Sequence, residues 1–142
     1  MTEKTGDLMA RLTSTDSPKE LDGYLEDIKD KYPTDLGSYI KAILAQRGLS
    51  KVEAIKNSKM DRGYFYQILE GIKNPSRDKI IQIAIGCEMT VTECQRALEI
   101  AQVGILYPKN QRDSLIIYGL NKKMSVLDLN CLLEEYKFDI LE

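Results

Sequence analysis

Few of the side chains that commonly carry out catalysis or bind metals are present in this chain of 142 residues. It contains no histidine, and its three cysteines, Cys87, Cys94 and Cys131, form no CxxC pair. The usual zinc sites and the Ser-His and Cys-His nucleophile pairs are therefore excluded. No carboxylate pair, glycine-rich phosphate loop or nucleophile motif has supporting context. We expect no enzyme, no metal site and no cofactor, and we expect the cysteines to pack as reduced thiols in the core.

The charged side chains are distributed unevenly along the chain. Residues 35–79 carry nine basic and five acidic side chains, whereas residues 1–34 carry five and eight, and residues 80–142 carry six and nine. The formal net charge of −2 hides this local excess of positive charge. Because a basic patch attracts a phosphate backbone, the middle third is where we expect a nucleic acid to bind.

The composition and the apolar spacing predict an all-α protein. Hydrophobic residues make up 43% of the sequence and charged residues 30%, which is typical of an ordered, soluble chain. Apolar residues recur every three or four positions, and the alternating runs of strands are absent. No apolar stretch approaches the roughly 18 residues that a membrane helix needs, and the N-terminus lacks a secretory core. We expect a cytoplasmic protein with no membrane partner.

Residues 1–34 predict an N-terminal helical segment. Ser17, Pro18 and Glu20 combine an N-cap hydroxyl, a proline at the first helical position and a carboxylate near the helix start. The helix should end at Tyr32-Pro33-Thr34, because the residue before a proline avoids the helical region. Its apolar stripe consists of Leu21, Tyr24, Leu25 and Ile28. Either this domain or a partner protein must cover that stripe.

The stretch from Leu36 to Ile72 predicts three helices in close succession. They should run from Leu36 to Arg47, from Ser50 to about Asn57, and from Arg62 to Glu70. Gly48 and Gly71 are suitable helix ends, and Ser50 and Asp61 are suitable N-caps. The third helix should bury Phe65, Ile68 and Leu69. Two short helices joined by a tight turn result.

This pattern resembles the Xre-like family of bacterial and phage regulators, which is related to lambda repressor. The resemblance runs from Leu36 to about Leu98 and rests on Arg47-Gly48-Leu49-Ser50, Glu53, Tyr64, Ile68, Gly71 and Asn74-Pro75-Ser76. It implies a lambda-repressor-like helix-turn-helix bundle over residues 35–103. It further implies a transcriptional regulator that binds double-stranded DNA as a homodimer, with the helix at about 62–70 in the major groove.

The resemblance also implies which residues contact DNA. Arg62, Gly63, Tyr66 and Gln67 lie near the N-terminal end of the second motif helix, where side chains reach base edges. Arg62 could fork onto guanine O6 and N7, and Gln67 could pair with adenine N6 and N7. Tyr66 either contacts a base or packs on the adjoining helix, and Gly63 either admits DNA closely or is merely tolerated in the first helical turn.

Phosphate contacts are implied at the ends of the two motif helices. Ser50 and Lys51 begin the first motif helix, and Lys73 and Asn74 follow the second. Contacts of this kind position a protein on DNA and do not specify sequence.

Four residues depart from the family pattern. Lys51 stands where glutamine is usual, Ile55 where a small alanine is usual, Lys59 in place of the turn glycine, and Leu69 where glutamate is common. A left-handed conformation at Lys59 would cost about 1 kcal/mol or more. These departures leave open a second function, that of a protein-interaction adaptor or inhibitor in which the helix-turn-helix is a scaffold. Steep salt dependence of DNA affinity would distinguish the regulator from the adaptor.

Residues 104–142 predict a C-terminal helical hairpin that repeats an earlier one. Shifting the sequence by 35 residues aligns residues 77–99 with 112–134, and seven of the 23 positions are identical. Capping boxes at Thr90 and Ser125 open the second helix of each copy. A duplicated hairpin would provide a surface for dimerisation or for a partner protein, although convergence of helical patterns also explains the similarity.

Overall fold

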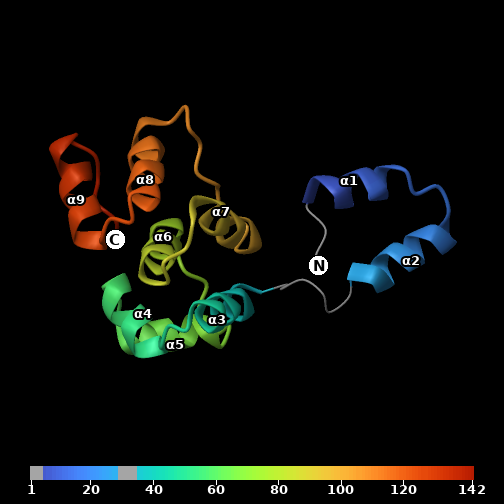
Figure 1. Ribbon diagram of the computed structural model, residues 1–142, viewed down its shortest axis with the longest axis horizontal. Coiled ribbons are helices and arrows are strands. Elements are labelled where there is room, and N and C mark those ends of the chain that lie inside the picture. Colours follow the sequence, from blue (N-terminus) through green and yellow to red (C-terminus); the bar gives the residue numbers. More distant parts are fainter. Residues whose placement is uncertain (1–4, 29–34) are drawn as a thin grey trace. The chain divides into compact units, whose positions relative to one another are not determined.

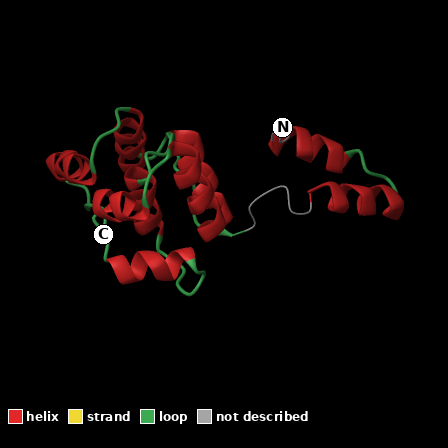
Figure 2. Cartoon of the chain, turned by 60° about the horizontal axis from the view of Figure 1, so that its bottom comes forward, coloured by secondary structure: helices red, strands yellow, loops and turns green. Residues whose placement is uncertain are grey.

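The computed structural model describes residues 5–28 and 35–142, and all regular structure in these ranges is helical (Figures 1 and 2). An all-α fold is thus confirmed for the described residues. The helix end expected at Tyr32-Pro33-Thr34 lies outside them. The chain divides into two compact units, Met1–Pro33 and Thr34–Glu142, which we describe separately.

The first unit contains two helices, α1 (Thr5–Thr13) and α2 (Pro18–Ile28). The start of α2 agrees with the prediction from the sequence, whereas α1 was not predicted. The Ser17 hydroxyl accepts a hydrogen bond from the Glu20 amide at 3.1 Å, so the expected cap is present. Tyr24 is buried beneath the Arg11 guanidinium, which lies 5.3 Å from its ring centroid. Leu21 and Leu25 of the expected stripe remain exposed.

The second unit begins with three helices, α3 (Leu36–Arg47), α4 (Lys51–Ser58) and α5 (Arg62–Leu69), which we call the head. Their bounds agree with the sequence-based expectation within a residue. The Asp61 carboxylate caps α5 by accepting from the Tyr64 amide at 2.9 Å. A Cβ on Gly37 of α3 would lie 2.2 Å from the Leu69 carbonyl oxygen, so these helices touch through their backbones. The side chains expected inside, those of Phe65, Ile68 and Leu69, are buried.

The head packs on a first hairpin formed by α6 (Arg77–Gly86) and α7 (Val91–Ile100). A Cβ on Gly86 would lie 2.7 Å from the Ala54 carbonyl oxygen, so α6 lies directly against α4. The buried Gln82 amide donates to the Ser58 carbonyl of α4 at 3.2 Å. On the other helix, Glu93 of α7 forms an ion pair with Arg47 of α3.

A second hairpin, α8 (Gln111–Asn121) and α9 (Val126–Glu135), belongs to the same compact unit. Corresponding structural features recur 35 residues apart in the two hairpins. The left-handed residues after the first and second helices are Glu88 and Gln102 in one copy and Lys123 and Lys137 in the other. The N-caps recur in part, since the Thr90 and Ser125 hydroxyls each accept a backbone amide at 3.1 Å. Only Thr90 has the full capping box expected at both positions, because the Glu93 carboxylate also accepts the Thr90 amide at 2.9 Å, whereas Ser125 has the hydroxyl cap alone.

The two hairpins bind each other reciprocally. Arg77 of α6 forms a bidentate ion pair with Asp113 of α8, at 3.0 and 2.8 Å. The equivalent pair, Arg112 of α8 with Asp78 of α6, forms at 3.2 and 3.0 Å. Helix packing is also reciprocal, because α6 contacts α9 and α7 contacts α8. These ion pairs and helix contacts therefore each have a counterpart with the copies exchanged, as in an isologous interface about an approximate two-fold axis.

The segment after each hairpin is held by its own copy. Arg77 donates from Nε to the Gly104 carbonyl at 2.8 Å, and Arg112 donates from Nε to the Asp139 carbonyl at 3.0 Å. Two apolar residues, Leu106 and Leu141, lie at equivalent positions in these segments and are both buried. Their amides donate to the side chains of Gln95 and Asn130, at 2.7 and 2.8 Å.

The cysteines meet only part of the expectation that they pack in the core. Cys87 and Cys94 are fully buried free thiols, and burial raises the pKa of each to about 12. Cys131 is exposed on α9, so the expectation of a core position was wrong for this residue. The equivalent position of the first hairpin is Arg96, which is also exposed, and the repeat therefore places Cys131 at the surface.

Candidate functional site

The turn between α4 and α5 contains a residue in the left-handed conformation, and this residue is not a glycine. Lys59 has φ 55° and ψ 42°, the conformation that glycine adopts most easily. The Lys59 amide donates to the Lys56 carbonyl at 3.2 Å, and the Met60 amide donates to the Ile55 carbonyl at 3.4 Å. These bonds close α4 as a glycine C-cap would. The replacement of glycine by Lys59 therefore leaves the turn tight and places a cation on it.

Three of the candidate contact residues gather around one aromatic ring. The Lys51 ammonium at the start of α4 and the Arg62 guanidinium at the start of α5 each lie 5.7 Å from the ring centroid of Tyr66. Both distances are within the range of cation–π attraction. Tyr66 is half-buried and also packs against the core. Lys51, which is expected to contact phosphate, thus lies beside Arg62 and Tyr66, which are expected to contact bases.

The remaining candidate base contacts lie on the same side of α5. Arg62 and Tyr66 are four residues apart, as are Gly63 and Gln67, so the two pairs form adjacent rows on one helix face. Arg62, Gly63 and Gln67 are exposed. A Cβ on Gly63 would meet only the Asp61 carboxylate, at 3.3 Å. Packing within the head therefore does not require glycine at position 63.

The candidate phosphate contacts lie at the start of α4 and after the end of α5. The Ser50 hydroxyl oxygen accepts from the Glu53 amide at 3.1 Å, which leaves the hydroxyl proton free to be donated. Lys73 and Asn74 are exposed on the segment after α5. The Gln67 carbonyl anchors that segment by accepting the Ile72 and Lys73 amides at 2.8 and 3.2 Å.

Sequence analysis missed two exposed apolar side chains beside these residues. Val52 follows Lys51 in the first turn of α4, and Ile72 precedes Lys73 after α5, and both are among the large apolar side chains that remain exposed. An apolar residue in an exposed first turn, where polar residues are usual, is the signal that could have found Val52.

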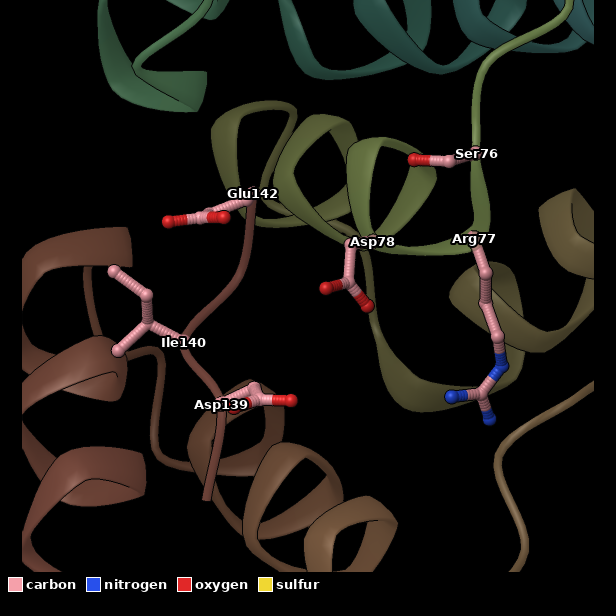
Figure 3. Close-up of a pocket in the computed structure, with 6 residues that line it drawn as sticks. All are labelled: Ser76, Arg77, Asp78, Asp139, Ile140 and Glu142. Atoms are coloured by element: carbon pink, nitrogen blue, oxygen red, sulfur yellow. The ribbon is translucent and has the colours of Figure 1, made fainter. Parts of the chain in front are cut away.

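The pocket drawn in Figure 3 lies elsewhere, between the N-terminus of α6 and the C-terminal segment. It has a volume of about 530 Å³ and is lined by Ser76, Arg77, Asp78, Asp139, Ile140 and Glu142. Arg77 and Asp78 are already engaged in the ion pairs between the hairpins. None of the candidate DNA contacts lines this pocket, so it is separate from the surface of α4 and α5.

Over residues 5–28 and 35–142, no group of three or more cysteine, aspartate or glutamate side chains is arranged to hold a metal ion. No helix in the same ranges combines the length and the apolar character needed to cross a bilayer.

Comparisons with protein-family models, with curated proteins and with solved structures find no match for this chain.

Proposed function

We propose that this protein is a sequence-specific DNA-binding transcriptional regulator whose α5 enters the major groove of double-stranded DNA. The observation that carries the proposal is the exposed face of α5 with Arg62, Gly63 and Gln67, together with the cluster of Lys51 and Arg62 around Tyr66. A helix start that presents forked donors, with cations on both sides, matches what a base edge and its flanking phosphates require. The proposed class is that of helix-turn-helix proteins without an enzymatic role. Within that class we assign it to the Xre-like family.

Each candidate residue has a stated role in this proposal. Arg62 and Gln67 read bases, guanine and adenine respectively. Tyr66 holds Arg62 in place through its ring and presents its outer edge to a base. Gly63 lets the backbone of α5 approach the DNA closely.

Phosphate binding comes from the flanking residues. Ser50, Lys51, Lys73 and Asn74 contact the two backbones on either side of the groove and fix the position of α5. These contacts make the affinity strongly dependent on salt.

The rest of the chain supports this activity in a cytoplasmic homodimer. Residues 35–103 form the DNA-binding domain, 1–34 the N-terminal helical segment, and 104–142 a hairpin that duplicates the preceding one. A two-fold dimer would bind two half-sites about one helical turn, roughly 34 Å, apart.

Selection of bound DNA from a random pool tests the proposal directly. A recovered palindrome is the expected result. The double variant Arg62→Ala/Gln67→Ala should then bind the selected DNA roughly 10- to 100-fold more weakly per lost contact. The control variant Lys109→Ala/Gln111→Ala removes the same charge from exposed positions outside the head and should bind normally. Equal binding by the first variant, with an unchanged circular dichroism spectrum, would exclude α5 as the reading helix.

A second function, that of an adaptor or inhibitor that binds a protein, is favoured by one observation. Among residues 5–28, four large apolar side chains are exposed, those of Met9, Leu12, Leu21 and Leu25, and exposed apolar surface of this kind can serve as a protein contact. DNA affinity measured against salt concentration separates the two functions. Release of counterions by several cations gives a steep loss of affinity for the regulator, whereas a flat response favours the adaptor.

A further inference from the structure

The two hairpins are equivalent in sequence and fold, but their outer faces have different surroundings. The first hairpin contacts the head through Gln82 and Gly86 of α6, which meet Ser58 and Ala54 of α4, and through Glu93 of α7, which pairs with Arg47. Arg96 of α7 interacts electrostatically with Tyr39 of α3. Ile83 and Ala97 lie three and four residues from Gly86 and Glu93, on the same helix faces. A shift of 35 residues converts these positions to Ile117, Tyr118, Asn121, Asp128, Cys131 and Leu132. We call this second set the outer face of the second hairpin.

The outer face of the second hairpin carries apolar side chains that the head would cover on the first. Ile83 is 1% exposed, whereas its equivalent Tyr118 is 52% exposed. Ala97 is buried, whereas Leu132 at the equivalent position is only half-buried. No helix of the first hairpin has a large exposed apolar side chain among its described residues. The second hairpin therefore keeps a helix-binding shape but lacks the helices that fill it.

Charge favours a second copy of this chain as the occupant. Asp128 lies on the outer face, and Lys122 borders it with its ammonium 5.9 Å from the Tyr118 ring centroid. A face with both signs of charge can pair with itself, because a two-fold axis brings the basic part of one copy to the acidic part of the other. A face with one sign would repel its copy.

The packing within the chain shows that this hairpin can bind its own kind. The first and second hairpins already associate isologously through Arg77–Asp113 and Asp78–Arg112. These ion pairs lie in the N-terminal turns of α6 and α8. The association also packs α6 against α9 and α7 against α8, and it leaves Tyr118 and Cys131 exposed. A second isologous contact through the outer face is therefore compatible with the first.

We propose that two copies of the chain pair through the outer faces of their second hairpins, with Tyr118 at the centre of the contact. The proposal rests on the proposed function for its two-fold symmetry, because a palindromic DNA site requires two heads. An isologous contact closes at two copies and forms no filament. It includes none of the residues proposed to bind DNA, so both α5 helices remain free.

Sedimentation equilibrium of the full chain without DNA tests the pairing. The wild type should be dimeric. The variant Tyr118→Glu/Cys131→Glu places two carboxylates on an apolar contact and should weaken dimerisation about 100-fold. Its unfolding midpoint at a protein concentration where the wild type is monomeric should match that of the wild type, since both positions are exposed in a single chain. The control Ile105→Glu changes an exposed apolar residue outside the outer face and should remain dimeric.

A wild type that stays monomeric would overturn the proposal, as would an unchanged dimer in Tyr118→Glu/Cys131→Glu. Loss of the dimer in Ile105→Glu as well would show that the contact lies elsewhere. DNA binding separates this test from that of the proposed function. Arg62→Ala/Gln67→Ala should lose selective DNA binding and stay dimeric, whereas Tyr118→Glu/Cys131→Glu should become monomeric and still bind a single half-site.

Discussion

The reciprocal ion pairs between the hairpins allow one substitution to be compared with its internal counterpart. Arg77→Ala removes four hydrogen bonds, two to Asp113 and one each to the Gly104 and Ile105 carbonyls, at distances of 2.8 to 3.0 Å. Arg112→Ala removes the equivalent four, at 3.0 to 3.4 Å. Both substitutions delete an arginine side chain. The difference between their effects on the free energy of unfolding therefore reports the environment of the partner carboxylate.

That environment predicts unequal costs. The Asp113 side chain is 9% exposed, whereas that of Asp78 is 26% exposed. Removing one partner of a buried pair leaves a charge that water cannot reach, at a cost of about 3 to 5 kcal/mol. A more accessible carboxylate is hydrated once its arginine has been removed, so loss of that ion pair costs only about 1 to 2 kcal/mol. We therefore expect Arg77→Ala to lower the free energy of unfolding by about 1 to 4 kcal/mol more than Arg112→Ala, as measured by urea denaturation.

The pH dependence of the Arg77→Ala penalty provides the second half of the test. Burial acts to raise the pKa of Asp113, but hydrogen bonds from Arg77 and the Tyr107 amide, with the charges of Arg77 and Arg112, hold that pKa below its ordinary value. Asp113 therefore stabilises the wild type at neutral pH, and this contribution is lost as pH falls through its folded-state pKa, below 3.8.

Without Arg77, burial should dominate and raise the pKa of Asp113 above its unfolded value. A group with a raised pKa destabilises the fold at neutral pH and ceases to do so once pH falls below that pKa. The difference in unfolding free energy between wild type and Arg77→Ala should accordingly shrink from pH 7 to about pH 4. Equal losses of unfolding free energy in Arg77→Ala and Arg112→Ala would refute this account of Asp113. So would a loss in Arg77→Ala that stays constant with pH.

Three further substitutions test the head and its contact with α6. Gly86→Ala should lower the free energy of unfolding by about 3 kcal/mol in urea denaturation, because its Cβ would lie 2.7 Å from backbone atoms of Ala54 and Ser58, which cannot move without separating α4 from α6. Lys59→Gly should raise that free energy by up to about 1 kcal/mol, because its left-handed conformation is strained for lysine; an unchanged stability would show that the turn carries no strain. Gly63→Ala should change stability by less than about 1 kcal/mol yet weaken binding to selected DNA at least tenfold in a fluorescence anisotropy titration. Full affinity in that variant would mean that DNA does not approach the α5 backbone closely.

Local signals in the sequence predicted the head well. Ser50 and Asp61 cap α4 and α5 through amides only three residues away, and Gly48 ends α3 in the left-handed conformation. Such interactions involve neighbours along the chain, so the residue types alone indicate them. Lys59 was harder to predict, because a lysine rarely adopts the conformation that the closing hydrogen bonds of α4 impose on it.

Contacts between distant segments could not be predicted in the same way. Arg77 and Asp113 are 36 residues apart, and nothing in either local sequence indicates the partner. The Arg-Asp pair at 77–78 and 112–113 was part of the aligned repeat, but its reciprocal use depends on how two folded hairpins meet. The same limit applies to the cluster around Tyr66, since Lys51 reaches the ring only once α4 and α5 have packed.

The differences between the two hairpins indicate what the second one is suited to bind. Where the first hairpin buries Ile83 and Cys87, the second has Tyr118 and Lys122, both exposed. A tyrosine buries a large apolar ring while keeping its hydroxyl in water, and a lysine at the edge limits non-specific association. A permanently covered face, like that beneath the head, would favour aliphatic residues instead. The second hairpin therefore has the composition of a contact that forms and separates. That composition suits the proposed pairing of two copies, in which dimerisation would control the affinity for a two-fold DNA site.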